Sequence, residues 1–168
     1  MTAPRNYLSV MRRRPRYLSA LGLILVETTG MEFLLGELLA AVMRTNQDVG
    51  VAIYHAPRSN TARLDILASA IDTVFFRGSL AQKHLNKIVN RARGCLERRN
   101  QYVHGLWGLS PNKRKVFVQF PPGPRKEVKL QDLKNLVRDL QTISTEAEMH
   151  KRAMSRQVAR SASPEKPP

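Results

Sequence analysis

The sequence predicts an all-α fold, an up-and-down bundle of four to five helices with a small β-hairpin insert. Long stretches repeat apolar residues at helical spacing, whereas the segment 115–120 alternates as a strand does. The 168 residues, 42% hydrophobic and 24% charged, are typical of one soluble globular domain. We therefore expect one helical domain over 16–154, between a flexible basic arm at 1–15 and a disordered basic tail at 155–168.

The helices are expected where apolar residues recur every three or four positions between caps and breakers. Asn60 or Thr61 is a candidate cap for the second helix, and Ser79 for the third. Gly105 and Gly108 stop the third helix. The expected helices span 17–44, 61–75, 80–105 and 131–154, with a link or helix end at 46–51 and a turn at 55–60.

The hairpin insert is expected between the last two helices. KVFVQF at 115–120 forms one strand and EVKL at 127–130 is its candidate partner, joined by PPGPRK. The prolines and basic residues in this turn indicate an exposed hairpin.

The charge of the chain indicates an anionic partner. The formal net charge is +15, and residues 1–16 hold five arginines and no acidic residue. Nucleic acid or acidic lipid would suit such a surface. The plainer alternative is a solvated basic surface with unstructured ends.

The apolar stretch 20–43 is predicted not to cross a membrane. Glu27, Glu32 and Glu37 interrupt it, and each carboxylate would cost about 2.5–3.5 kcal/mol at the centre of a bilayer. The basic and then apolar start resembles a signal peptide but lacks the small-residue cleavage site. An organellar targeting segment is the alternative; we expect a cytoplasmic protein without membrane association.

The third helix holds the most informative residues. On a wheel of about 100° per residue, Arg99 falls in the middle of the apolar face and Arg98 on the solvent side. Asn100 and His104 lie one turn apart on the flank. Because a buried unpaired charge costs several kcal/mol, Arg99 needs a partner or a wet cavity. The structural alternative is a pair with Glu27, Glu32 or another carboxylate of a neighbouring helix, or a snorkelling side chain. A helix-capping role is the alternative for His104.

The segment Arg99-Asn100-Gln101-Tyr102-Val103-His104-Gly105 resembles the R-x4-6-H signature of the HEPN superfamily. A polar residue directly after the Arg and small and aromatic residues after the His are also similar to that family. The resemblance in layout covers roughly residues 17–150. It implies an all-helical ribonuclease that acts as a homodimer without metal or cofactor, with two motif helices facing each other across a shared cleft. Such a cleft would also explain an arginine on an apolar stripe.

RNA supplies its own nucleophile, the ribose 2′-OH, so these residue types suit RNA cleavage. His104 can take the proton, and Arg99 can stabilise the charge on the phosphoryl oxygens. Asn100 can orient the imidazole or a phosphate oxygen. The expected product is a 2′,3′-cyclic phosphate. The histidines show no metal-ligand spacing, so we expect no metal site.

Substrate binding is expected from basic residues near the motif and from one aromatic ring, Tyr102, for which simple packing is the alternative. The candidate RNA-binding residues are Arg91, Arg93, Arg98, Lys113, Arg114, Lys115 and Tyr102.

The resemblance further implies a toxin or defence effector with an antitoxin of the nucleotidyltransferase type. Two alternatives stay open. One is a HEPN-like module that binds RNA or a nucleotide without cutting it. The other is a helical dimerisation or adaptor protein that uses its basic tails on nucleic acid or membrane.

Overall fold

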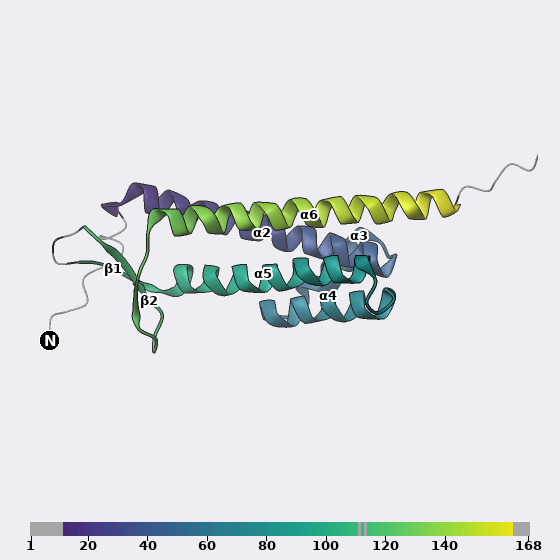
Figure 1. Ribbon diagram of the computed structural model, residues 1–168, viewed down its shortest axis with the longest axis horizontal. Helices are drawn as coiled ribbons and strands as arrows, with labels where there is room; N and C mark the ends of the chain where they lie inside the picture. The colour runs from purple at the N-terminus through teal and green to yellow at the C-terminus, as the bar shows by residue number, and fades with distance from the viewer. Residues whose placement is uncertain (1–11, 111, 113, 163–168) are drawn as a thin grey trace, which may run out of the picture. The chain divides into compact units, whose positions relative to one another are not determined.

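The computed structural model describes residues 12–110, 112 and 114–162, and it confirms an all-α bundle with a small β insert (Figure 1). The expected arm at 1–15 lies largely outside the described residues, which begin at residue 12. The first long helix begins at Pro15. The helices are α2 (Pro15–Met43), α3 (Gln47–His55), α4 (Asn60–Val74), α5 (Leu80–His104) and α6 (Leu130–Ala162). The strands are β1 (Leu106–Leu109), β2 (Val116–Gln119) and β3 (Arg125–Glu127).

The helical domain expected over 16–154 consists of two compact units. The first unit comprises the described residues up to Thr29 together with those of Gly94–Gln141, and it includes the sheet. The second comprises Gly30–Arg93 and the described residues from Thr142 onward, and it includes α3 and α4. The helices α2, α5 and α6 each contribute residues to both units.

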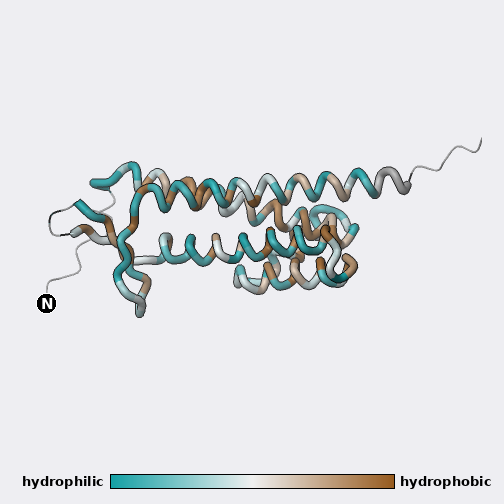
Figure 2. Tube along the Cα trace, in the orientation of Figure 1, coloured by the Kyte–Doolittle hydropathy of each residue, from teal (hydrophilic) through white to brown (hydrophobic). Residues whose placement is uncertain are grey.

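Each unit has its own set of buried apolar side chains. Figure 2 shows α5 as mostly hydrophilic, with hydrophobic residues at helical intervals. In the first unit the buried apolar residues include Ala20, Ile24, Cys95, Leu96, Trp107, Val116, Val118, Val128, Leu133, Leu136 and Leu140. In the second unit they include Met31, Leu35, Leu38, Leu39, Tyr54, Leu64, Leu67, Ile71, Leu85, Ile88, Val89, Ile143 and Ala147.

The sheet is antiparallel, in the order β1-β2-β3. The expected strand at 115–120 is confirmed as β2, whereas its partner β3 lies at Arg125–Glu127, earlier than the expected 127–130. The sequence predicts only a helix stop at 105–111, and the structure adds β1 there, with Trp107 opposite Val118. Gly108 weakens the strand signal of this short segment, which explains why the pattern does not reveal it.

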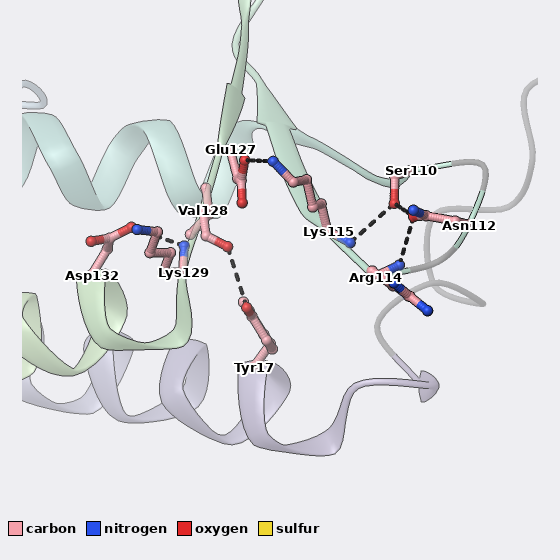
Figure 3. A network of polar contacts seen from close by, with 9 residues as sticks. All are labelled: Tyr17, Ser110, Asn112, Arg114, Lys115, Glu127, Val128, Lys129 and Asp132. Atoms are coloured by element: carbon pink, nitrogen blue, oxygen red, sulfur yellow. Dashed lines mark hydrogen bonds and ion pairs between the residues drawn. The ribbon is translucent and has the colours of Figure 1, made fainter.

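Side-chain contacts fasten the sheet at both edges (Figure 3). Lys115 Nζ lies 2.8 Å from Glu127 Oε2, across β2 and β3, and the Lys115 amide donates to Ser110 Oγ at 3.0 Å. Tyr17 Oη, near the start of α2, donates to the carbonyl of Val128 at 3.3 Å. The two Lys115 contacts join segments of the sheet to one another, and the Tyr17 bond joins the chain directly after β3 to α2.

Three helix boundaries differ from the expectation. The link expected at 46–51 is the start of α3, where Asn46 Oδ1 accepts the Asp48 amide at 2.8 Å as an N-cap does. The cap of α4 is Ser59, not Asn60 or Thr61, because Ser59 Oγ accepts the Ala62 amide at 3.1 Å. α6 continues to Ala162, so the tail expected to be disordered from 155 is helical up to that residue. Residues 163–168 lie outside the described part of the chain.

Helix α2 is long and apolar enough to cross a membrane by length and composition, and 28% of its most apolar stretch is buried within the protein. Core helices of soluble proteins and signal sequences also meet this criterion. The acidic residues that argue against a span are each engaged inside one unit. Glu27 accepts Gln141 Nε2, and Glu32 pairs with Arg63. The absence of a membrane span stays a prediction.

Candidate functional site

The candidate catalytic residues occupy the last two turns of α5, in the first unit. The helix ends at His104 because the sheet packs closely behind it. A Cβ added to Gly105 would lie 2.3 Å from the carbonyl oxygen of Gln101 and 2.3 Å from Val118 Cγ2. Only glycine therefore fits at this position without a shift of the helix or of β2, and the close approach fixes where the helix stops.

Arg99 is half-buried and carries a charge that no carboxylate neutralises among the described residues. Its Nη1 donates to Asn100 Oδ1 at 2.9 Å, and its Nε is buried without an acceptor. The carboxylates suggested as partners are engaged elsewhere: Glu27 accepts Gln141 Nε2 at 2.8 Å and Glu32 pairs with Arg63 at 3.1 Å. A buried donor without an acceptor is rare in proteins. Because Nε itself is closed off from solvent, it is the lack of a carboxylate partner that leaves the charge of the guanidinium available to an anion.

His104 is exposed and lies one helical turn after the half-buried Asn100. Residues four apart on a helix are neighbours on its surface. Asn100 therefore has contact with the Arg99 guanidinium on one side and is the helical neighbour of His104 on the other. The last two turns of α5 present a cation, an amide and an imidazole within one short segment.

Most apolar residues of the α5 stripe are buried within the chain. Leu85, Ile88 and Val89 are at most 2% exposed, and Cys95 and Leu96 at most 3%. These residues are buried within their own units, whereas Leu106, at the end of the stripe, is 41% exposed. A dimer cleft beside Arg99 therefore stays a prediction. The lack of an acceptor at Arg99 Nε is the feature that still sets this arginine apart.

The helical wheel predicts that the Arg98 side chain faces solvent. In the structure it is half-exposed and forms an ion pair. Its Nη2 donates to Asp139 Oδ2 on α6 at 2.7 Å and to Cys95 Sγ at 3.2 Å. Partial burial alone would lower the pKa of Arg98, but the hydrogen bonds to Asp139 and Cys95 outweigh it and raise this pKa above the usual value of arginine. In the first unit, Arg98 therefore ties α5 to α6.

Other candidate RNA-binding cations are also paired with carboxylates. In the second unit, Arg91 lies 2.6 Å from Glu146 and Arg93 lies 2.8 Å from Asp65. In such pairs a carboxylate neutralises part of the positive charge, so less of this charge is available to bind a phosphate.

The three residues of the basic run 113–115, before β2, differ in whether their charges are paired. Lys115 pairs with Glu127, whereas the guanidinium of Arg114 has no partner among the described residues (Figure 3). Lys113 lies outside the described residues. Of this run, Arg114 is thus the described residue with an unengaged charge.

Tyr102 is in the core of the first unit and is only 6% exposed, which corrects its candidate role as a base-stacking residue. Its carbonyl accepts Trp107 Nε1 at 2.8 Å, and the two rings lie 6.1 Å apart. Burial raises the pKa of Tyr102, and the Asp132 carboxylate adds to this effect. A buried ring offers no face to a base, so Tyr102 has a packing role.

Sequence reasoning missed a second group of cations, in the other unit. Arg77, Lys83 and Lys87 line an open groove at the end of α4 and the start of α5. None of the three has an ion pair or side-chain hydrogen bond among the residues that the structure describes. Lys83 and Lys87 are four residues apart on α5, and this spacing is the signal that could have revealed them.

Among residues 12–110, 112 and 114–162, no three His, Cys, Asp or Glu side chains form a group that could hold a metal ion. No protein-family model, curated protein or solved structure matches this chain. What the site can do must therefore follow from its own geometry and chemistry.

Proposed function

We propose that this chain is a HEPN-like endoribonuclease that cleaves RNA by attack of the ribose 2′-OH on the adjacent phosphodiester, without a metal ion. The observation that carries the proposal is the half-buried Arg99, with a buried Nε that lacks an acceptor, bonded to Asn100 one turn before the exposed His104. This short segment is also where the sequence resembles the R-x4-6-H signature.

The proposed reaction breaks one P–O bond and forms another. His104 takes the proton of the 2′-OH as the 2′-oxygen attacks phosphorus. The bond from phosphorus to the 5′-oxygen breaks, and this oxygen is protonated by the second copy's histidine or by water. The products are a 2′,3′-cyclic phosphate and a 5′-hydroxyl end.

Arg99 supports this reaction through its charge. The transition state gathers negative charge on the phosphoryl oxygens, and a guanidinium donates charge-assisted hydrogen bonds to such oxygens while staying protonated. An arginine already paired with a carboxylate would bind a phosphate oxygen more weakly. The engaged positions of Glu27 and Glu32 keep Arg99 available.

The deciding experiment is the digestion of single-stranded RNA in EDTA. We expect wild type to cut RNA and to leave intact the same sequence carrying 2′-O-methyl groups, which lacks the nucleophile. His104→Ala and Arg99→Ala should each slow cleavage by about 10²–10⁴-fold, the range for a general base or an oxyanion donor.

The control is His55→Ala, because His55 is also an exposed histidine at the last residue of a helix. It should cleave as wild type does. Equal cleavage by wild type, His104→Ala and Arg99→Ala would exclude the proposed roles. Loss of cleavage in His55→Ala as well would point to damage to the fold.

A further inference from the structure

The groove in the second unit is built from the end of α4, the turn after it and the first three turns of α5. In Figure 1 these segments follow one another at one end of α4. The groove is open and encloses about 980 Å³. It is separate in sequence from the candidate catalytic residues, which all follow Gly94.

The groove is strongly cationic. Arg77, Lys83, Lys87 and Arg91 line it, against one carboxylate, Asp72. Arg91 is paired with Glu146, and Asp72 accepts two amide groups. The other three cations have no partner among the described residues, so their charge faces the solvent of the groove.

The groove is also held in shape. Gln82 is 9% exposed; its Oε1 accepts the Gly78 amide at 2.6 Å and its Nε2 donates to Asp72 at 2.8 Å. Asn86 Nδ2 donates to the same Asp72 oxygen at 2.8 Å. Gly78 has a φ of +82°, which a residue with a side chain rarely adopts, so the turn that presents Arg77 depends on glycine.

We propose that this groove binds the sugar-phosphate backbone of single-stranded RNA, and thereby holds the substrate of the proposed ribonuclease. The choice of RNA rests on the proposed function. The lining supports a phosphodiester chain because lysine, arginine and amide side chains are the usual donors to phosphate oxygens. The residues that line it include no aromatic ring and no large aliphatic side chain. The exposed Phe76 lies next to Arg77 in the sequence, at the edge of this lining.

Binding in this groove is therefore independent of base sequence and sensitive to salt. The test uses a fluorescein-labelled single strand with 2′-O-methyl riboses, which cannot be cleaved through the 2′-oxygen, and measures anisotropy against protein concentration at several salt concentrations. The variant is Lys83→Glu/Lys87→Glu; both side chains are exposed and unpaired among the described residues, so the fold is expected to persist.

We expect the double variant to bind at least tenfold more weakly than wild type. The slope of log K against log salt should fall by about 1.4, since each phosphate contact on a single strand contributes roughly 0.7. A DNA strand of the same sequence should lose affinity by the same factor, because only phosphates are contacted.

The matched control is Lys126→Glu/Lys129→Glu, which makes the same change of charge at two exposed lysines of the first unit. It should keep most of the wild-type affinity. Equal losses in the two double variants, unchanged binding by Lys83→Glu/Lys87→Glu, or displacement of the RNA by polyglutamate at equal charge concentration would each overturn the proposal.

The two proposals fail in different ways. A wild-type protein that binds the strand through these lysines and cuts no RNA refutes the ribonuclease alone. A protein that cuts RNA equally well with and without Lys83 and Lys87, at substrate concentrations below saturation, refutes the groove alone.

Discussion

At the scale of single residues, the decisive feature is which charged groups have partners. Arg91, Arg93 and Arg98 resemble Arg99 in type and in their position on α5, yet each of them meets a carboxylate. Arg99 instead has an amide, Asn100, and a buried nitrogen without an acceptor. An amide orients a guanidinium without neutralising it, so this pair can hold the charge ready for an anion.

Asn100 is therefore expected to act as a positioning residue. In Asn100→Ala the guanidinium loses the acceptor that orients it, and we expect kcat for RNA cleavage to fall roughly 10–100-fold, the cost of a small misplacement of a catalytic group. KM should change much less, because Asn100 does not supply the charge that attracts RNA.

The nearly isosteric Asn100→Asp separates orientation from charge. A carboxylate at this position would pair with Arg99 and neutralise it, so kcat should fall further than in Asn100→Ala. Both constants come from steady-state cleavage of a fluorogenic RNA. Full activity in Asn100→Asp would show that an unneutralised Arg99 is not needed.

At the scale of the elements, the meeting of α5 with the sheet determines where His104 is placed. Gly105 is the residue at which they touch, and a methyl group there meets both Gln101 and Val118 at 2.3 Å. Gly94, in the interior of the same helix, has nothing within 4 Å of an added Cβ. Gly105, directly after α5, is therefore closely packed, whereas Gly94, in the middle of α5, has open space beside it.

The substitution by alanine should reveal this contrast. Gly105→Ala is expected to lower the free energy of unfolding by about 1–3 kcal/mol, as overpacking does. Gly94→Ala should raise it by about 0.5–1 kcal/mol, the gain from replacing glycine within a helix. Urea unfolding followed by circular dichroism measures both; stabilisation by Gly105→Ala would contradict the close packing of β2 against the helix end.

The elements also show what sequence patterns can and cannot predict. The four helices that apolar repeats predict are found, and α2, α4 and α5 lie within two residues of their expected bounds, whereas α6 extends eight residues past its expected end. The short α3 and β1 contain glycines that weaken both helix and strand signals, and they form because the rest of the chain packs on them.

The candidate site is only partly predictable for a similar reason. Helical spacing places Asn100 and His104 together and marks Arg99 as unusual. Helical spacing cannot show which residues Glu27 and Glu32 contact, or that Asp139 forms an ion pair with Arg98. These pairs join segments far apart in the sequence. Tyr102 is a further case: the sequence leaves base stacking and simple packing open, and the contact with Trp107 on β1 shows that the ring is packed.

At the scale of the whole molecule, the prediction concerns where a second copy would bind. The resemblance to the HEPN superfamily implies a homodimer, whereas most apolar residues of the α5 stripe are buried within the chain. The first half of α2 leaves Leu18, Leu25 and Val26 exposed at 51%, 41% and 68%. A run of exposed apolar side chains on one helix is typical of an interaction surface, so this part of α2 is where we expect a homodimer to form its contact.

This assignment predicts the molar mass in solution. Sedimentation equilibrium of wild type should give twice the chain mass of 19.0 kDa, and Val26→Asp should shift it towards the monomer, because a carboxylate buried in an apolar contact is costly. Val49→Asp is the control, since Val49 is also an exposed valine, but on α3. If the cleft is shared, Val26→Asp should also lose RNA cleavage in proportion to the dimer that it loses, and adding more protein should restore both. A wild type that sediments as a monomer yet cleaves RNA, or a Val26→Asp that stays dimeric, would contradict the shared cleft or its α2 contact respectively.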